Sequence, residues 1–189
     1  MTRLRLRTAG PDDSEGIALL HADSWRRHYR GAYADAFLDG DVAADRRAVW
    51  SRRLADREAR SATVVAEDGG EGGDLVGFVH VAFDADDKWG SLIDNLHVRH
   101  ARRRDGIGTA LITRAARAVT DEADGDAVHL WVLEQNTQAQ AFYRAFGGVC
   151  VERVPVSPPG GVPERLNGNP TKLRFAWADA TLLTRPTVS

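Results

Sequence analysis

The alternation of apolar and polar positions divides this chain into short strands and amphipathic helices. Leu4 and Leu6 alternate with arginines, which is the period-two pattern of a half-buried strand. Six further apolar runs predict strands, at residues 62–66, 75–81, 89–98, 128–133, 149–151 and 172–177. Apolar residues at helical spacing predict helical regions at residues 11–29, 33–42, 44–57, 107–119 and 137–146.

This order of elements predicts an α/β (α+β) fold with a mixed sheet covered by helices on both faces. Gly69–Gly73 is expected to form a flexible hairpin loop, and Pro155–Pro170 a loop rich in proline and glycine. The chain shows no internal repeat and no domain boundary. We therefore expect one domain over residues 1–180 and a C-terminal tail over residues 181–189.

Composition narrows the class of protein further. The net charge of −2 over 189 residues gives no bulk attraction to nucleic acid. Cys150 is the only cysteine, so neither an intramolecular disulfide nor a cysteine-based zinc site is expected. The first residues lack the apolar stretch of a signal peptide, and no apolar run is as long as a membrane span. These features predict a cytoplasmic protein with no membrane, nucleic-acid or metal partner.

A turn rich in arginine and glycine lies between the strand at 89–98 and the helix at 107–119. Gly106 and Gly108 allow the backbone to approach a ligand that a Cβ atom would obstruct. The N–H groups at the start of the helix have no intrahelical partner, so anionic oxygens can accept from them. Arginines at 102–104 add positive charge. The turn predicts a site for a phosphorylated ligand, although a solvated charge run is the alternative interpretation.

A second motif, which begins at Asn136, makes the first more specific. Residues 103–108 fit the pattern R/Q-x-x-G-x-G/A, and residues 136–147 fit N-x-x-A-x-x-F-Y-x-x-x-G. Both motifs, in this order and at this separation, resemble those of the GCN5-related N-acetyltransferase (GNAT) superfamily. The resemblance covers roughly residues 3–178 and implies a mostly antiparallel sheet that splays between its fourth and fifth strands, with acetyl-CoA bound in the gap.

The same resemblance implies how acetyl-CoA is held. Backbone groups near Leu96 and Val98 would bind the pantetheine arm, and one N–H there would polarise the thioester carbonyl. Asn136 would bind the pantetheine amide, or it caps the helix that follows. The expected cofactor-binding residues are Leu96, His97, Val98, Arg103, Arg104, Asp105, Gly106, Ile107, Gly108, Thr109, Asn136 and Tyr143.

The resemblance also implies catalytic roles. Tyr143 would protonate the departing thiolate of coenzyme A. Many relatives carry a catalytic glutamate four residues before the position of Leu96, but here that residue is Leu92. Asp94 lies two residues further on, and by alternation on the same face, so it is the expected base, acting directly or through water. The other candidates are Glu134 and His97, although alternation places His97 on the opposite face.

A segment that begins at Ser24 resembles the S-W-x-x-x-Y-R-G sequence of many bacterial members. Trp25, Tyr29 and Tyr33 are expected either to border the acceptor site or to cap the core. Together these features predict an acetyl-CoA-dependent N-acetyltransferase that acts on a primary amine of a small molecule or peptide, in a ternary complex. A non-catalytic acyl-CoA-binding module and a protein N-terminal acetyltransferase are the alternatives, and use of longer acyl groups stays open. Dimers are common among similar proteins, so a homodimer is one possibility and the oligomeric state stays open.

Overall fold

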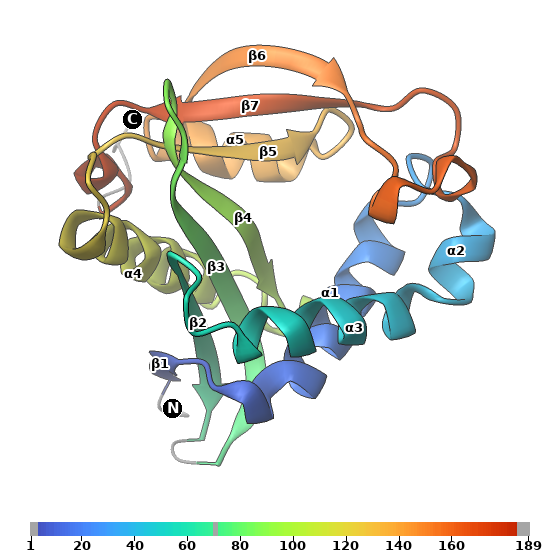
Figure 1. Cartoon of the computed structure of the whole chain (residues 1–189), viewed down its shortest axis with the longest axis horizontal. Coiled ribbons are helices and arrows are strands. Elements are labelled where there is room, and N and C mark those ends of the chain that lie inside the picture. The colour runs from blue at the N-terminus through green and yellow to red at the C-terminus, as the bar shows by residue number, and fades with distance from the viewer. Residues whose placement is uncertain (1–3, 70–71, 185–189) are drawn as a thin grey trace.

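A computed structural model describes residues 4–69 and 72–184 and shows one seven-stranded sheet (Figure 1). The strand order is β1-β2-β3-β4-β5-β7-β6, and every neighbouring pair is antiparallel except β4–β5, which is parallel. This is the mixed, mostly antiparallel sheet that the resemblance implies. The strands are β1 (Leu4–Thr8), β2 (Ser61–Asp68), β3 (Asp74–Asp86), β4 (Gly90–Val98), β5 (Val128–Leu133), β6 (Val149–Pro155) and β7 (Thr171–Trp177).

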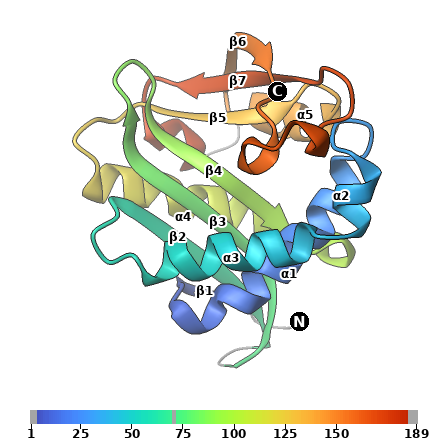
Figure 2. The same cartoon turned by 45° about the vertical axis from the view of Figure 1, so that its right-hand side comes forward.

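Helices cover both faces of the sheet, as predicted (Figures 1 and 2). One face carries α4 and α5, and the other carries α1 and α3. The helices are α1 (Ser14–His28), α2 (Asp35–Asp39), α3 (Val42–Ala55), α4 (Ile107–Glu122) and α5 (Thr137–Ala145). The helical region expected over 33–42 is shorter in the structure, because Tyr33 forms a β-bridge with Leu166 and the α2 helix ends at Gly40. Among the described residues, no helix is both long and apolar enough to cross a membrane.

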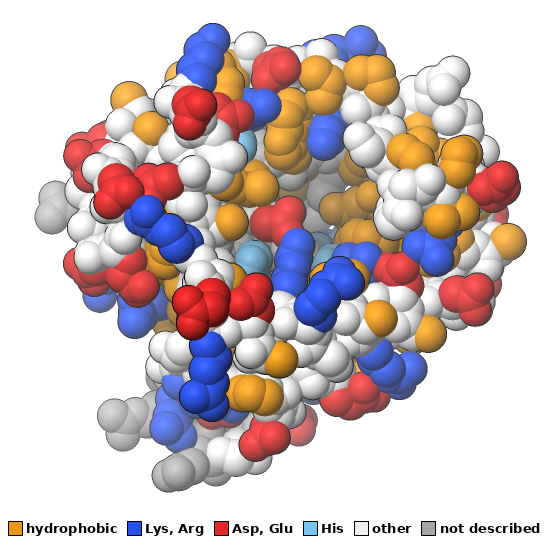
Figure 3. All heavy atoms as spheres, in the orientation of Figure 1, with side chains coloured by type: hydrophobic (Ala, Val, Ile, Leu, Met, Phe, Trp, Pro, Cys, Tyr) orange, Lys and Arg blue, Asp and Glu red, His pale blue; other side chains and the backbone are white. Residues whose placement is uncertain are grey.

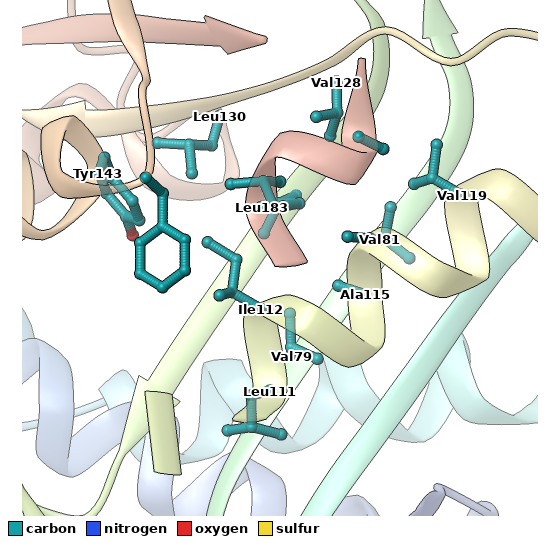
Figure 4. Close-up of a cluster of buried hydrophobic side chains, with 14 of the residues drawn as sticks. Val79, Val81, Leu111, Ile112, Ala115, Val119, Val128, Leu130, Tyr143 and Leu183 are labelled. Carbon is teal, nitrogen blue, oxygen red and sulfur yellow. The ribbon is translucent and has the colours of Figure 1, made fainter. Parts of the chain in front are cut away.

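The largest hydrophobic core lies between the sheet and α4 (Figure 4). It includes fully buried residues of α4 such as Leu111 and Ile112, which pack against strand residues such as Leu130. Leu183 is also fully buried in this core, on a 3₁₀ helix over Ala180–Thr184. The expected tail therefore begins as packed structure. Residues 185–189 of that tail lie outside the described residues, as do residues 1–3 and residues 70 and 71 of the expected hairpin loop.

The parallel strands β4 and β5 pair over only a short length and then separate. Their register joins Ser91 to Val128, Leu92 to His129 and Ile93 to Leu130, and includes no later pair. Gly90 stands at the paired end with a φ of +72°, and a Cβ atom there would lie 2.1 Å from the carbonyl oxygen of Ala127. A glycine is therefore required for the two segments to approach this closely. Beyond Ile93, the two strands leave space between them.

A β-bulge in β4 changes which side chains face that space. His80 of β3 pairs with Asn95 and Val81 pairs with Ile93, so Asp94 is an extra residue without a partner on β3. Because of this extra residue, the strict alternation expected for β4 fails. His97 pairs with Phe78 and lies on the face covered by α1, as Asp94 does. The expectation that His97 lies on the face opposite to Asp94 was therefore wrong.

Candidate active site

The diverging ends of β4 and β5 border a cavity of about 450 Å³, a size typical of small-molecule sites. In the orientation of Figure 3, the surface is hollowed between the β6–β7 side of the molecule and α1 and α3, with hydrophobic, acidic and basic side chains around the hollow. Most of the predicted site residues line the cavity, namely Tyr29, Asp94, Leu96, His97, Val98, Arg103, Arg104, Gly106, Gly108, Thr109, Asn136 and Tyr143.

Other predicted site residues do not line the cavity. Trp25 and Tyr33 are buried in a second core with Phe37. Ile107 is buried against the sheet, which leaves only its backbone near the cavity. Asp105 accepts a hydrogen bond from Arg102 Nε (2.7 Å) and so stabilises the turn.

The turn before α4 forms the cationic end of the cavity. Gly106 is the N-cap residue of α4 with a φ of +78°, and Arg104 also has a positive φ of 70°. A Cβ atom at Gly106 would meet nothing within 4 Å, so open space lies in front of the helix N-terminus. The unpaired N–H groups of a first helical turn and the nearby arginines suit a pyrophosphate. The residues present therefore fit the diphosphate of a coenzyme A thioester.

Arginines in this turn have different neighbours. Arg103 Nη1 donates to Gln138 Oε1 (3.3 Å), and its Nη2 contacts the imidazole of His28. Arg102 forms an ion pair with Asp68 in addition to its bond with Asp105. Arg102 is thus neutralised, whereas Arg103 extends across the cavity mouth between α1 and α5 and retains its charge for a ligand.

Tyr143 lies on α5 with its side chain among the residues of the main core (Figure 4), and it also lines the cavity. Its ring packs against Phe175 and Trp177, with ring centroids 6.1 and 6.3 Å away. Burial and the neighbouring Tyr29 raise its pKa above the ordinary tyrosine value. Within the described residues its hydroxyl makes no hydrogen bond. The phenol is therefore protonated at neutral pH and free to donate to a ligand.

The position of Asn136 is compatible with both of the roles expected for it. Its side-chain oxygen accepts a hydrogen bond from the Ala139 N–H (3.1 Å), so it caps α5. The residue also lines the cavity, and its amide nitrogen is available to a ligand there.

Three groups considered as the catalytic base differ in their surroundings. The Asp94 carboxylate lies 2.6 Å from Arg53 Nη2 and accepts from Asn95 Nδ2 (2.8 Å), while its residue lines the cavity. Glu134 is held by Arg153 and the Thr171 hydroxyl, which lower its pKa to about 2. Burial lowers the pKa of His97 to about 3, so its imidazole is neutral. Asp94 is the carboxylate among these that faces the cavity.

Several residues of the cavity wall had not been selected from the sequence. Ser24 is joined to His97 by a hydrogen bond between Ser24 Oγ and His97 Nδ1 (2.7 Å), and Asn95 adjoins Asp94. Trp131 and Leu133 alternate with the core residues Leu130 and Val132 along β5. That alternation is the available signal, but every position of the strand except His129 is apolar, so the sequence does not separate the core side from the cavity side.

Two buried histidines, His21 of α1 and His80 of β3, make stability sensitive to acid. Burial lowers the pKa of His80 to about 4, and His21 is also held neutral by burial. Because an unfolded histidine titrates near 6.5, the stability that each neutral imidazole contributes is complete above pH 6.5 and falls as the pH drops towards the folded value. We expect protonation of His80 alone to lower the free energy of unfolding by roughly 2 kcal/mol between pH 7 and pH 5.

Denaturant unfolding of the wild type and His80→Asn at both pH values measures this effect. The variant should lose less unfolding free energy on acidification than the wild type. Equal losses in the two proteins would show that His80 is not responsible.

Several known proteins are similar to this chain in sequence or in structure. A probable N-acetyltransferase of Mycobacterium tuberculosis is 27% identical over 145 residues, which are 75% of this chain and 78% of that protein. The PaiA N-acetyltransferase of Thermoplasma acidophilum, solved with coenzyme A, has a TM-score of 0.70 at 15% identity, over 93% of this chain and 99% of that one. NAA60 of Arabidopsis thaliana, solved with acetyl-CoA, has a TM-score of 0.65 at 18% identity, over 93% and 98% of the two chains.

These solved structures share the fold, and the ligands that they contain are coenzyme A and acetyl-CoA. The model of the acetyltransferase (GNAT) family matches residues 20–147, which include both sequence motifs and most of the cavity wall. Since that match covers more than half of the chain, the protein belongs to the GNAT acetyltransferase family, whose acetyl donor is acetyl-CoA.

Proposed function

We propose that this protein transfers the acetyl group of acetyl-CoA to the primary amine of a small molecule, by direct attack in a ternary complex. The observation that carries the proposal is the continuity of the cavity. It extends from the cationic turn at Gly106, past Tyr143, to Asp94. A single space thus adjoins a site for the donor's phosphates, an acid and a carboxylate base.

Each group has a step to perform. Asp94 accepts a proton from the acceptor ammonium, directly or through water, and leaves a nucleophilic amine. The part of β4 between Asp94 and Val98 has no partner on β5 in the described structure, so N–H groups at that edge can polarise the thioester carbonyl. As the new C–N bond forms and the C–S bond breaks, Tyr143 donates its phenolic proton to the thiolate of coenzyme A.

The loop between β6 and β7 favours a small acceptor over a peptide. It packs against the segment between α1 and α2, where the Ala34 N–H donates to the Arg165 carbonyl and the Asn167 N–H to the Ala32 carbonyl, both at 2.9 Å. Arg165 also pairs with Asp45 of α3 (2.6 Å). A peptide groove on this side would need open space between these segments. The hydrogen bonds join them instead.

Release of free thiol tests this proposal. Purified protein is incubated with acetyl-CoA and a panel of primary amines, and a thiol-reactive dye follows coenzyme A. We expect release that depends on both the protein and a particular amine, with the matching acetamide detected by mass spectrometry. Saturable binding of acetyl-CoA without amine-dependent thiol release would instead support the non-catalytic module, and release only with peptide N-termini would support the protein N-terminal acetyltransferase.

A further inference from the structure

Lys172 lies behind the cavity wall, against a tryptophan that lines the cavity, in a position that the proposed chemistry does not use. It lies on β7 directly opposite Leu133 of β5, so the two side chains share a face of the sheet. Leu133 and Trp131 both line the cavity, and Lys172 Nζ lies 4.5 Å from the centroid of the Trp131 ring. The ammonium group is therefore held beside the indole that forms part of the cavity wall.

The surrounding arginines have carboxylate partners. Arg53 pairs with Asp94, Arg153 pairs with Glu134, and Arg174 is bound on two sides, by Asp86 (2.9 Å) and by Glu152 (2.8 Å). The ammonium group of Lys172, by contrast, has no ion pair and no hydrogen bond with any residue that the structure describes.

Lys172 is partly buried, so it has lost some of its hydration without gaining an anion. Its burial and the positive charge of Arg174 lower its pKa, and the negative charges of Asp94 and Glu152 offset this only in part. A ligand carboxylate at this position would supply the missing counter-charge. A second ammonium group of a diamine would meet the ammonium group of Lys172 and be repelled.

We propose that the acceptor is an amino acid or related amine with a free carboxylate, which Lys172 binds while Asp94 faces the amine. This inference rests on the proposed acetyl transfer and specifies its substrate class. In the sheet, β5 lies between β4, which carries Asp94, and β7, which carries Lys172. Trp131 of β5 lines the cavity between these two strands and contacts Lys172. Opposite charges placed in this way match a molecule with an ammonium group at one end and a carboxylate at the other.

Three matched sets of acceptors test the inference: free amino acids, their primary amides, and the amines that lack the carboxylate altogether. A charge-assisted hydrogen bond corresponds to a preference of about 10- to 100-fold in kcat/KM for the free acid over the amide. Lys172→Met should bring this ratio close to one, chiefly by raising KM for the acid. Lys172→Arg should keep part of the preference because it keeps the charge.

Lys88→Met is the matched control, because Lys88 is the only other lysine and also lies 4.5 Å from a tryptophan ring, that of Trp89, outside the cavity. It should retain the wild-type ratio. Thiol release with amides or diamines in preference to free acids would overturn the carboxylate inference and leave acetyl transfer intact. An unchanged acid-to-amide ratio in Lys172→Met would also overturn it. No thiol release with any acceptor would refute acetyl transfer itself, and the substrate inference with it.

Discussion

Replacement of Tyr143 by phenylalanine is expected to lower kcat by about 10²- to 10⁴-fold, the range of a general acid, and to leave acetyl-CoA affinity nearly unchanged. The ring is enclosed by Phe175 and Trp177, so phenylalanine fills the same space. Only the hydroxyl is lost, and it makes no hydrogen bond within the described residues that would be needed for folding. Steady-state kinetics and calorimetric titration with acetyl-CoA separate turnover from binding.

Tyr33→Phe provides the control for this prediction. Tyr33 is 7% exposed, similar to Tyr143 at 8%, but it lies in the second core and does not line the cavity. Its variant should keep wild-type turnover. If Tyr143→Phe kept full turnover, or if both variants lost activity equally, Tyr143 would not be the acid.

Loss of the Asp94 carboxylate is expected to have the second large effect. Asp94→Asn should reduce kcat/KM at neutral pH by roughly 10²-fold and shift the alkaline-rising limb of its pH profile, because the acceptor ammonium must then lose its proton without help. Asparagine retains the size of the side chain, although it weakens the contact with Arg53. Measurement of kcat/KM from pH 6 to pH 10 gives both quantities.

Glu134→Gln is a suitable comparison for Asp94→Asn. Glu134 is a carboxylate at the end of β5, but Arg153 and Thr171 hold it in its ionised form, with a pKa of about 2. It is therefore a poor proton acceptor, and its replacement should leave the pH profile in place. An Asp94→Asn profile identical to that of the wild type would remove Asp94 as the base.

Local patterns predicted most of the fold and both motifs that border the cavity. Each of the two motifs, at Gly106 and at Tyr143, is a continuous stretch of sequence, and both border one cavity in the structure. Side-chain direction in β4 was harder to predict, because one inserted residue at Asp94 turns His97 to the other face and nothing in the local sequence marks the bulge.

The position of Lys172 beside Trp131 depends on the pairing of β5 with β7, two strands separated by a helix and a third strand. Such register is set by tertiary packing and not by neighbouring residues. Trp25 and Tyr33 illustrate the same limit, because an aromatic residue that lines a site and one that is buried in a core next to it have the same sequence pattern.

The short contact between β4 and β5 also affects how far apart the two strands lie at the cavity. It is the one place in the described structure where β1–β4 and the β5–β7–β6 group join as a sheet, through three residue pairs. The free part of β4 extends about 15 Å beyond it, so a rotation of about 5° at this joint moves the far end by about 1 Å. A displacement of that size can alter a reaction rate about 100-fold. The close approach of Gly90 to Ala127, at the paired end of the two strands, therefore helps to set the width of the cavity at their other end.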